Sequence, residues 1–447
     1  MIKVMKSLRN INYRLFFALL IMGLIPTIYT TVRIFFLGQM PGDWGFNIAS
    51  QLSYVNLLYE IIQEALILPL FFFIGKTIGN TIEMTNRVRT GMLVTFLIYG
   101  MLSILILIFA KPLVKFMAQD IALIDETVTY IRLETIATLF STLVKFITIV
   151  IVTLKKDIYL YFILGLQMFI CILLDTFFVS NLSFSLKLGV NGIAYTNIIV
   201  NILMLFLAVF FLNKEKIFLF SKEKLNFNWM KEWTKISAYS GIESLVRNLA
   251  FMLMIVKMVN IVGEQGTFWV ANNFIWGWLL LPIIQLGELI KRDCGENKSL
   301  IKENFLGYMV ITTCVIILWL ITIPLWQPFL KSVMNIDNYK NVFNLVLISL
   351  AFYVLFAFNN ICDSIFYGIG ETKYMLVQSL IINIVFYGLM YILYVAGIFV
   401  PTLTSIALMF AGGTALDSVL TYFMFAFFVK KGGLTDKEML NSKNTIY

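Results

Sequence analysis

The chain has 447 residues, of which 60% are hydrophobic and only 13% are charged. This charged share is about half that of a typical soluble domain, and the mean hydropathy is +0.88. The composition excludes an ordinary soluble protein and indicates a helical protein that crosses a membrane several times. The formal net charge of +9 is therefore expected in loops beside the membrane and does not indicate nucleic-acid binding.

Apolar runs long enough to cross a bilayer occur twelve times along the chain. A helix needs roughly 20 mostly apolar residues to span the hydrocarbon core. The first run follows a basic N-terminus, MIKVMKSLRN, without a small-residue cleavage site, so we interpret it as a retained helix. The predicted spans are 15–37, 49–75, 90–110, 127–154, 158–180, 189–212, 237–262, 267–290, 305–325, 341–368, 373–398 and 403–429.

Lysine and arginine residues are unevenly distributed between the two sides of this predicted bundle. An even number of helices places both termini on one side, and most of the Lys and Arg residues of the loops fall on that side. Because positively charged loops stay in the cytoplasm, both termini are predicted to be cytoplasmic. The opposite loops contain only Lys111, Lys115, Lys187, Lys331 and Lys340.

A lysine-rich stretch, 214–235, divides the chain near its middle. We predict a cytoplasmic linker, either an amphipathic helix on the membrane surface or a solvated loop with anchoring aromatic residues. The two halves also resemble each other. When Tyr159 is matched with Tyr374, the starts of the sixth and twelfth helices match as well, at Leu188 and Leu403.

This correspondence predicts a duplicated transporter fold. The expected fold class is an all-α polytopic membrane protein with twelve transmembrane helices in two pseudo-symmetric six-helix lobes. The predicted domains are an N-terminal lobe, a linker, a C-terminal lobe and a cytoplasmic tail, at residues 1–213, 214–235, 236–429 and 430–447.

Two stretches carry a resemblance to a known family. LLDTFFVSNLSFSLKLGVNGIAYTNIIVN, ending at Asn201, resembles the fifth and sixth helices of the multidrug and toxic compound extrusion (MATE) family of the MOP flippase superfamily. FYGIGETKYM resembles the family's Gly-x-Gly-(Asp/Glu)-Thr-Lys turn. The residues that match these motifs are Asp175, Gly189, Val190, Gly192, Ala194, Gly368, Gly370, Glu371, Thr372 and Lys373.

The resemblance implies an alternating-access transporter that exports organic, often cationic, compounds in exchange for sodium ions or protons. It also implies a coupling site with acids on the first and fifth helices, where Asp175 matches the fifth-helix acid. The chain departs from the family at Arg33, where an acid is usual, and at Cys171, where Asn is often found. We therefore expect weak or absent sodium binding there, with coupling through Glu64 or the second lobe.

Charged residues at membrane depth are costly, so they usually pair or line a cavity. In the first lobe, Arg33 is expected to pair with Asp175, Glu60 or Glu134. Such charges could serve packing alone, with Arg33 and Lys145 neutralising some acids, but the cluster as a whole favours transport. Its members are Arg33, Glu60, Glu64, Glu134, Lys145 and Asp175.

In the second lobe, Glu243 and Arg247 are one helical turn apart and could pair. Amides and aromatic residues on the eighth and tenth helices suit an amphipathic substrate, although a lipid-facing tryptophan is an equal alternative. The candidates are Asn273, Trp276 and Asn360. Pro26 interrupts the first helix and is a candidate hinge.

We expect a secondary transporter that exports small organic compounds, amphipathic or cationic, by antiport with sodium ions or protons. The alternative is a flippase for a lipid-linked or anionic substrate, which would need a basic cavity. The chain has no histidine and no nucleophile or P-loop motif, so an enzyme is not expected. We also expect no cofactor and no nucleic acid, a monomer in the plasma membrane, and a small-molecule substrate and the lipid bilayer as partners.

Overall fold

The computed structural model describes residues 2–40, 44–67, 69–77, 79–154, 156–221, 223–296, 299–369, 371 and 373–432. Helices account for all regular structure in this part of the chain. Most of the predicted tail at 430–447 lies outside the described residues, as do Gly370 and Thr372 of the glycine-rich turn.

The first half of the chain forms a short N-terminal helix and six membrane segments, the second of them in four pieces. The elements are α1 (Ile2–Asn10), α2 (Tyr13–Leu37), α3 (Trp44–Ser50), α4 (Leu52–Ile62), η1 (Gln63–Ile67), α5 (Leu70–Gly75), α6 (Thr81–Phe116), η2 (Ile121–Leu123), α7 (Ile124–Thr153), α8 (Asp157–Phe178) and α9 (Val190–Lys214).

The second half forms six further segments, four of which contain a π-helical turn. The elements are α10 (Met230–Phe251), η3 (Met252–Val256), α11 (Lys257–Ile261), α12 (Gln265–Phe274), η4 (Ile275–Leu279), α13 (Leu281–Glu296), α14 (Ser299–Pro328), η5 (Phe329–Val333), α15 (Tyr339–Gly368), α16 (Lys373–Leu380), η6 (Ile381–Phe386), α17 (Tyr387–Val395) and α18 (Leu403–Lys430).

All twelve predicted spans correspond to helical segments of the described chain. Nine of these helices are individually long and apolar enough to cross a membrane, and a tenth results if α12–η4 and α13, bent by 52°, form one span. The remaining two segments, α3–α5 and α10–α11, fail this test. The segment α3–α5 is divided into short helices. The hydropathy of both segments is reduced by charged residues, which include Glu60, Glu64, Glu243 and Arg247. These two segments carry much of the candidate site.

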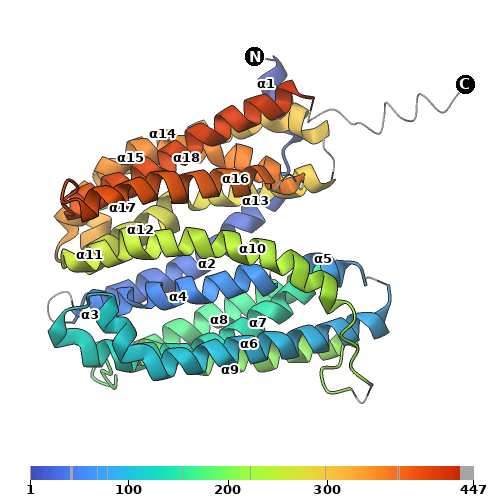
Figure 1. Ribbon diagram of the computed structural model, residues 1–447, viewed down its shortest axis with the longest axis horizontal. Coiled ribbons are helices and arrows are strands. Elements are labelled where there is room, and N and C mark those ends of the chain that lie inside the picture. Colours follow the sequence, from blue (N-terminus) through green and yellow to red (C-terminus); the bar gives the residue numbers. More distant parts are fainter. Residues whose placement is uncertain are drawn as a thin grey trace, which may run out of the picture.

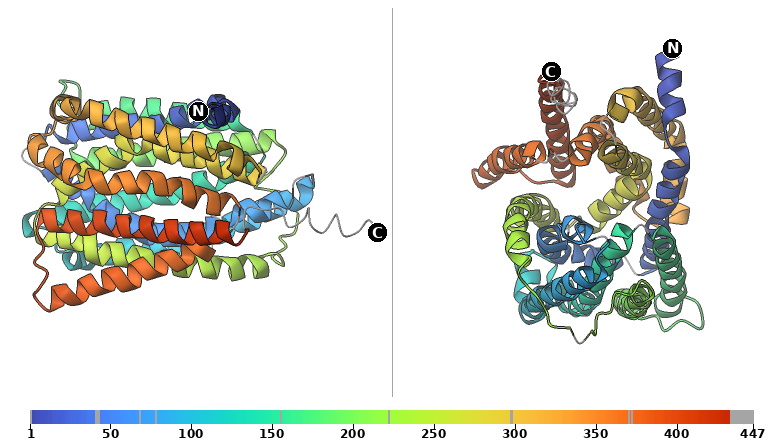
Figure 2. Two further views of the ribbon diagram at one scale, coloured as in Figure 1. Left: turned by 90° about the horizontal axis from the view of Figure 1, so that it is seen from above. Right: turned by 90° about the vertical axis from the view of Figure 1, so that its right-hand side faces the viewer.

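The helices form two groups, which Figure 1 shows in the lower and upper parts of the molecule. The lower group contains α3 to α9 and the upper group α12 to α18, while α10 lies between them. α10 packs against α4 and η1 on one side and against α16 on the other. The end-on view in Figure 2 shows α1 beside the upper group, and α2 packs on both α13 of the upper group and α8 of the lower group. α1 packs on α14, and the hydroxyl of Ser7 accepts a 2.8 Å hydrogen bond from the backbone N–H of Gly307.

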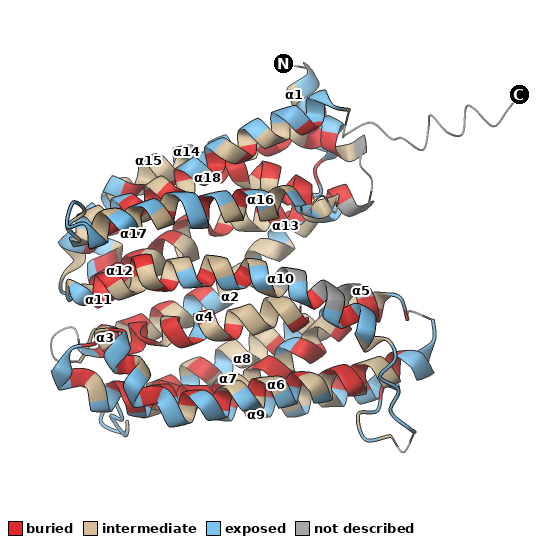
Figure 3. Cartoon of the chain, viewed as in Figure 1, coloured by how far each residue is buried: buried red, intermediate tan, exposed pale blue. Residues whose placement is uncertain are grey.

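Burial within the lobes follows the pattern of a protein that sits in lipid. Buried residues face the interior of each group of helices, and many exposed positions lie on the outer faces (Figure 3). Large apolar side chains are exposed there, among them Ile108, Phe206 and Phe423, which are 61%, 72% and 72% exposed. Apolar exposure on this scale would be unfavourable in water, but it suits helices that contact acyl chains.

The predicted linker is a loop anchored by aromatic residues up to Met230, where α10 begins. The described residues between α9 and α10 form no helix, so the amphipathic-helix alternative is not observed. Arg89 on α6 donates hydrogen bonds to three backbone carbonyls of this loop. Trp229 donates to the hydroxyl of Thr90, and the buried Trp233 donates to the carbonyl of Leu66. These contacts fix the start of α10 against the first half.

At the end of the bundle opposite α1, which we call the far end, the two halves are in contact. Four buried amide side chains form hydrogen bonds there, and we call them the far-end amide cluster. Gln51 and Asn260 exchange hydrogen bonds of 2.9 and 2.8 Å, and Gln265 donates to Gln119 over 3.1 Å. Each of the four is at most 5% exposed. Burial makes these bonds costly to leave unmade, so the cluster holds the far end closed.

Candidate functional site

A cavity of about 570 Å³ lies among the helices of the first half, and we call it the first cavity. Many of its lining residues are polar, and they come from the first six membrane segments. Of the six charged candidates predicted in this lobe, all but Asp175 line the cavity directly. The charged lining residues are Arg33, Glu60, Glu64, Glu134 and Lys145.

Arg33 forms an ion pair at membrane depth, as the sequence predicted. Its Nε lies 2.6 Å from Oδ2 of Asp175, whose side chain is 1% exposed. Its Nη2 donates to the side-chain oxygen of Asn197 over 2.6 Å, and the amide of Asn197 donates to Glu134 over 2.7 Å. The guanidinium therefore links α2, α8 and α9, and Asn197 extends the network to α7.

Asn197 was not selected from the sequence, although it lies within the stretch that resembles the MATE family. An asparagine in an apolar helix is a weak signal because an amide can simply bond its own helix. Here the side-chain oxygen of Asn197 accepts from Arg33 and its nitrogen donates to Glu134. This arrangement can be recognised only when the relative positions of α2, α7 and α9 are known.

Lys145 lies in the same cavity, where it interacts electrostatically with Glu60 but forms no ion pair within 4 Å among the described residues. Its Nζ donates to the side-chain oxygen of Gln63 over 2.9 Å. The charge pairing that the packing interpretation expects is therefore direct for Arg33 and longer-range for Lys145. A flexible amine of this kind is free to follow the cavity lining, whereas Arg33 is held by two side chains.

Glu243 and Arg247 are neighbours on α10, but their contact is not the main one that Arg247 makes. Arg247 Nε is 3.9 Å from Glu243 Oε1, whereas Arg247 Nη2 is 2.5 Å from Oε1 of Glu64 and 3.7 Å from Oε1 of Glu60. The predicted Glu243–Arg247 pair is therefore present, but it is the longest of the three ion pairs that Arg247 forms. The physical reason is that α10 packs against α4 and η1, so the guanidinium reaches the first half.

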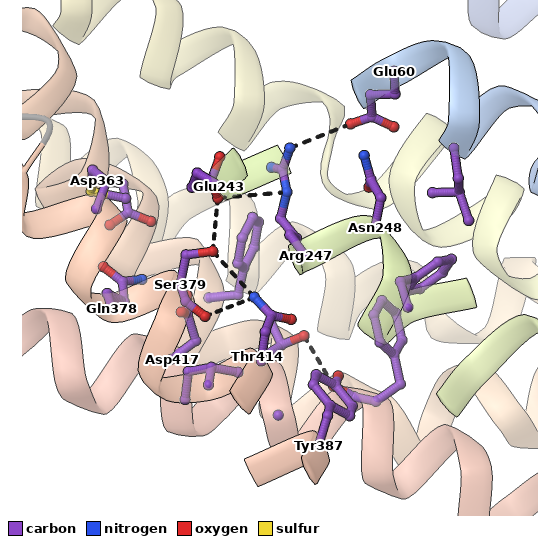
Figure 4. A pocket seen from close by; sticks show the side chains of 18 of the residues that line it. Glu60, Glu243, Arg247, Asn248, Asp363, Gln378, Ser379, Tyr387, Thr414 and Asp417 are labelled. Carbon is purple, nitrogen blue, oxygen red and sulfur yellow. Dashed lines mark hydrogen bonds and ion pairs between the residues drawn. The ribbon is translucent and has the colours of Figure 1, made fainter. Parts of the chain in front are cut away.

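A second cavity, of about 500 Å³, lies on the other side of this arginine. It is lined by α4, α10, α12, η4, α15, α16, η6, α17 and α18, and Figure 4 shows its labelled side chains pointing inward. Four carboxylates line it, from Glu60, Glu243, Asp363 and Asp417, against one basic residue, Arg247. Formally, its lining is therefore negative.

Asp363 and Asp417 bring carboxylates of α15 and α18 to this cavity (Figure 4). Asp363 Oδ2 accepts a 2.8 Å hydrogen bond from Asn359. In the described part of the chain, Oδ1 of Asp363 and Oε1 of Gln378 are buried without a hydrogen-bond partner. Unpaired buried acceptors are costly, so this corner of the cavity is suited to receive a cation.

Neither Asp363 nor Asp417 was among the candidates selected from the sequence. The available signal was the same for both, a carboxylate inside an apolar span. Its meaning depended on the rotation of α15 and α18, which sequence periodicity left open because both helices are apolar on most faces.

The aromatic and amide candidates, Trp276, Asn273 and Asn360, lie in three different places in the structure. Trp276 lines the second cavity and makes edge-on ring contacts with Tyr353 and Phe356. Asn273 lines a separate small cavity of about 130 Å³ and donates to the carbonyl of Trp269. Asn360 lines neither large cavity, because its amide donates over 2.7 Å to the carbonyl of Ile283 and so joins α15 to α13.

Pro26 lies inside α2, which continues as helix on both sides of it. Together with Asn273, it lines the small cavity between the two halves. Thr27, the next residue, donates to the carbonyls of Gly23 and Gly277 over 3.2 and 3.1 Å. The hinge role of Pro26 stays a prediction.

Comparisons by sequence find no known relative, whereas comparisons by structure do. No family model matches the sequence, and no curated protein matches it either. Solved structures match over almost the whole chain, but at low sequence identity.

One similar structure is the inward-facing conformation of a multidrug resistance MATE family transporter of the MOP superfamily. It has a TM-score of 0.73 and 14% identity over 92% of this chain and 96% of that one. A variant of the MATE transporter VcmN from Vibrio cholerae has a TM-score of 0.70 and 13% identity, over 97% and 99%.

A MOP superfamily transporter from Pyrococcus furiosus, described as having a binding pocket of reverse polarity, has a TM-score of 0.67 and 15% identity, over 97% and 98%. The chain therefore has the two-lobed, twelve-helix fold of MATE transporters, as the sequence resemblance predicted. At these identities, the likeness supports the fold alone.

Proposed function

We propose that this chain is a secondary transporter of the MOP superfamily that exports amphipathic organic cations in exchange for sodium ions or protons. The observation that carries the proposal is the lining of the second cavity. Four carboxylates and a single arginine line it, together with aromatic residues such as Trp276 and Phe356. The MATE fold supports alternating access of this cavity to the two sides of the membrane.

The chemistry of the lining favours a cation that also has an apolar surface. Aromatic faces attract cations through the ring quadrupole, and apolar walls bury the organic part of the ligand. Carboxylates at membrane depth supply the opposite charge, where screening by water is weak. A flippase for an anionic substrate would need the opposite lining, so it is the less favoured alternative.

The coupling ion is proposed to bind in the second cavity, near Asp363 and Asp417. In the first lobe, Asp175 is not available to bind a coupling ion, because its Oδ2 is paired with Nε of Arg33 at 2.6 Å. Arginine does not lose its proton in proteins. A coupled cation must bind and leave in each cycle, whereas this pair is permanently formed.

Placement in the cell follows from the same proposal. We propose a plasma-membrane protein with both termini in the cytoplasm, which acts as a monomer and needs no cofactor. With this orientation the far-end amide cluster lies on the external side, and the described conformation is closed to the exterior. The uneven distribution of Lys and Arg supports the orientation.

The test is transport of ethidium, an aromatic monocation, by proteoliposomes containing the full chain under separate sodium and proton gradients. Wild type is expected to move ethidium with one of the two gradients. Asp363→Asn and Asp417→Asn should each lower the coupled flux by about tenfold, because each removes one charge that attracts the cations.

Asp125→Asn is the matched control, since Asp125 is exposed and pairs only at the surface with Lys111 at 2.8 Å. Its flux should equal that of wild type. Ethidium flux that depends on neither gradient, or that is unchanged in both cavity variants, would contradict the proposal.

A further inference from the structure

Arg247 stands at the boundary between the two large cavities. It lines the second cavity directly, while its partner Glu64 lines the first, and Glu60 lines both. Figure 4 shows Glu60 and Glu243 approaching the guanidinium from different helices. A ligand cation that enters from either side therefore meets carboxylates that already hold an internal cation.

The charges of this group do not balance. One guanidinium lies within 4 Å of three carboxylates, which belong to Glu60, Glu64 and Glu243. Their formal charges sum to an excess of two negative charges. Glu243 also accepts a 2.7 Å hydrogen bond from Ser379 on α16, which turns its carboxylate toward the second cavity.

The group is accessible rather than sealed. The side chains of Arg247 and Glu60 are 38% and 42% exposed, in contrast with 1% for the paired Asp175. The 3.7 Å and 3.9 Å contacts of Arg247 are loose, and only the 2.5 Å contact with Glu64 is close. A competing cation can therefore reach Glu60 and Glu243 without first disrupting a tight buried pair.

We propose that Arg247 is an internal competitor of the transported cation: the organic cation binds at Glu60 and Glu243 by displacing the Arg247 side chain from them. This inference rests on the proposed function and deepens it by assigning the residue that sets cation affinity. Arg247 is thus a specificity-determining and positioning residue.

Displacement has a structural consequence because the ion pairs cross between the two halves. Arg247 is on α10, whereas Glu60 and Glu64 are on α4 and η1. When the bound cation takes over part of this negative charge, the electrostatic connection between α10 and the first half weakens. Binding of the cation is therefore linked to movement of α10 against that half.

The first measurement is ethidium binding to purified full-length protein in nanodiscs, followed by fluorescence anisotropy. Arg247→Gln removes the competitor and leaves all three carboxylates, so ethidium should bind more tightly by about tenfold, within the usual range of coupling between sites. The same variant should transport more slowly at saturating ethidium, because the cation no longer exchanges with an internal charge when it leaves.

Arg132→Gln is the matched control. It makes the same substitution at an exposed arginine that lines neither cavity and donates only to the carbonyl of Leu107 in the described chain. Its ethidium affinity and transport rate should equal those of wild type. A gain in affinity shared by both variants would reflect net charge alone and would overturn the proposal.

Arg247→Lys covers the case in which the glutamine variant does not fold. Lysine keeps the charge, but its compact ammonium lacks the planar fork that reaches several carboxylates at once. Its ethidium affinity should fall between those of wild type and Arg247→Gln. An affinity equal to or weaker than that of wild type would overturn the proposal.

The outcomes separate this inference from the proposed function. If wild type binds and transports ethidium but Arg247→Gln binds it no more tightly, the inference fails and the proposed function stands. If neither wild type nor the Arg247 variants bind ethidium, both fail. Tighter binding with slower transport in Arg247→Gln, and no change in Arg132→Gln, supports both.

Discussion

At the scale of single residues, the chain treats its two membrane-depth arginines differently. Arg33 is almost fully enclosed and bonds Asp175 and Asn197 at 2.6 Å each. Arg247 is about two-fifths exposed and faces three carboxylates. A tightly paired, enclosed charge fixes helices, whereas a loosely held and accessible one can be exchanged. This contrast assigns packing to the first arginine and selectivity to the second.

A single and a double substitution test the structural role of Arg33. Arg33→Ala leaves the buried carboxylate of Asp175 without its cation, so it should reduce the free energy of unfolding by on the order of 3 kcal/mol. Arg33→Met combined with Asp175→Leu removes both charges and should recover most of that loss. Reversible unfolding in mixed micelles measures both values.

One result of these measurements would contradict the structural role of the Arg33–Asp175 pair. If Arg33→Ala and wild type unfold with the same free energy, the pair does not stabilise the first lobe. The expected loss assumes a nearly dry environment, which the 1% exposure of Asp175 supports.

At the scale of helices, glycines at the far end allow the two halves to approach closely. A Cβ on Gly38, at the end of α2, would lie 1.9 Å from the carbonyl oxygen of Asn335 in the loop before α15. A Cβ on Gly266, in α12, would lie 2.6 Å from the side-chain oxygen of Asn47 on α3. The contact with the backbone of Asn335 is sterically forbidden, and the contact with Asn47 would force that side chain to move, so these glycines permit the closure that the far-end amide cluster then holds.

Gly38→Ala should therefore shift the protein toward a conformation that is open at the far end. Gly38 has φ −67°, which alanine adopts freely, so the effect is steric and not a matter of backbone strain. The reporter is Ser50→Cys, a position that is 4% exposed, in a background without other cysteines. Its alkylation by a maleimide should become faster by about tenfold.

Gly165→Ala is the control for this experiment. Gly165 lies in α8, and nothing is within 4 Å of the position of an added Cβ. Alkylation at position 50 should keep its wild-type rate in this variant. An unchanged rate in Gly38→Ala as well would show that close packing at the far end does not restrict opening.

At the scale of the whole molecule, the chain places most of its positive charge at one end of the bundle. α1 begins at that end, the linker joins α9 to α10 there, and the last helix, α18, ends there (Figure 1). Basic loops are retained in the cytoplasm during insertion. The same end carries the loop that Arg89 and the two tryptophans fix to the first half.

Cysteine accessibility tests this orientation. In a background without native cysteines, Leu225→Cys should react with a membrane-impermeant maleimide only after cells are permeabilised, because Leu225 lies in the predicted cytoplasmic linker and is 39% exposed. Leu186→Cys, in the loop between α8 and α9 and 53% exposed, should react in intact cells. The reverse pattern would show that the molecule has the opposite orientation.

The sequence by itself determined the membrane class, the twelve segments and the pairing of Arg33 with an acid. These features follow from local or additive properties. Twenty apolar residues form a helix in lipid because the backbone has no other partner there, and a guanidinium among apolar residues needs a carboxylate. The predicted spans and the observed helices accordingly differ mainly at their ends.

Only the tertiary structure decided which charges share a cavity. Arg247 lies closer to Glu64 than to Glu243 because α10 packs against η1. Asp363 and Asp417 share the second cavity because α15 and α18 turn these residues inward. Asn360, which the sequence analysis did select, bonds the backbone of α13 instead. The rotation of an apolar helix about its own axis depends on close packing with its neighbours, and that packing is set by contacts between residues far apart in the sequence.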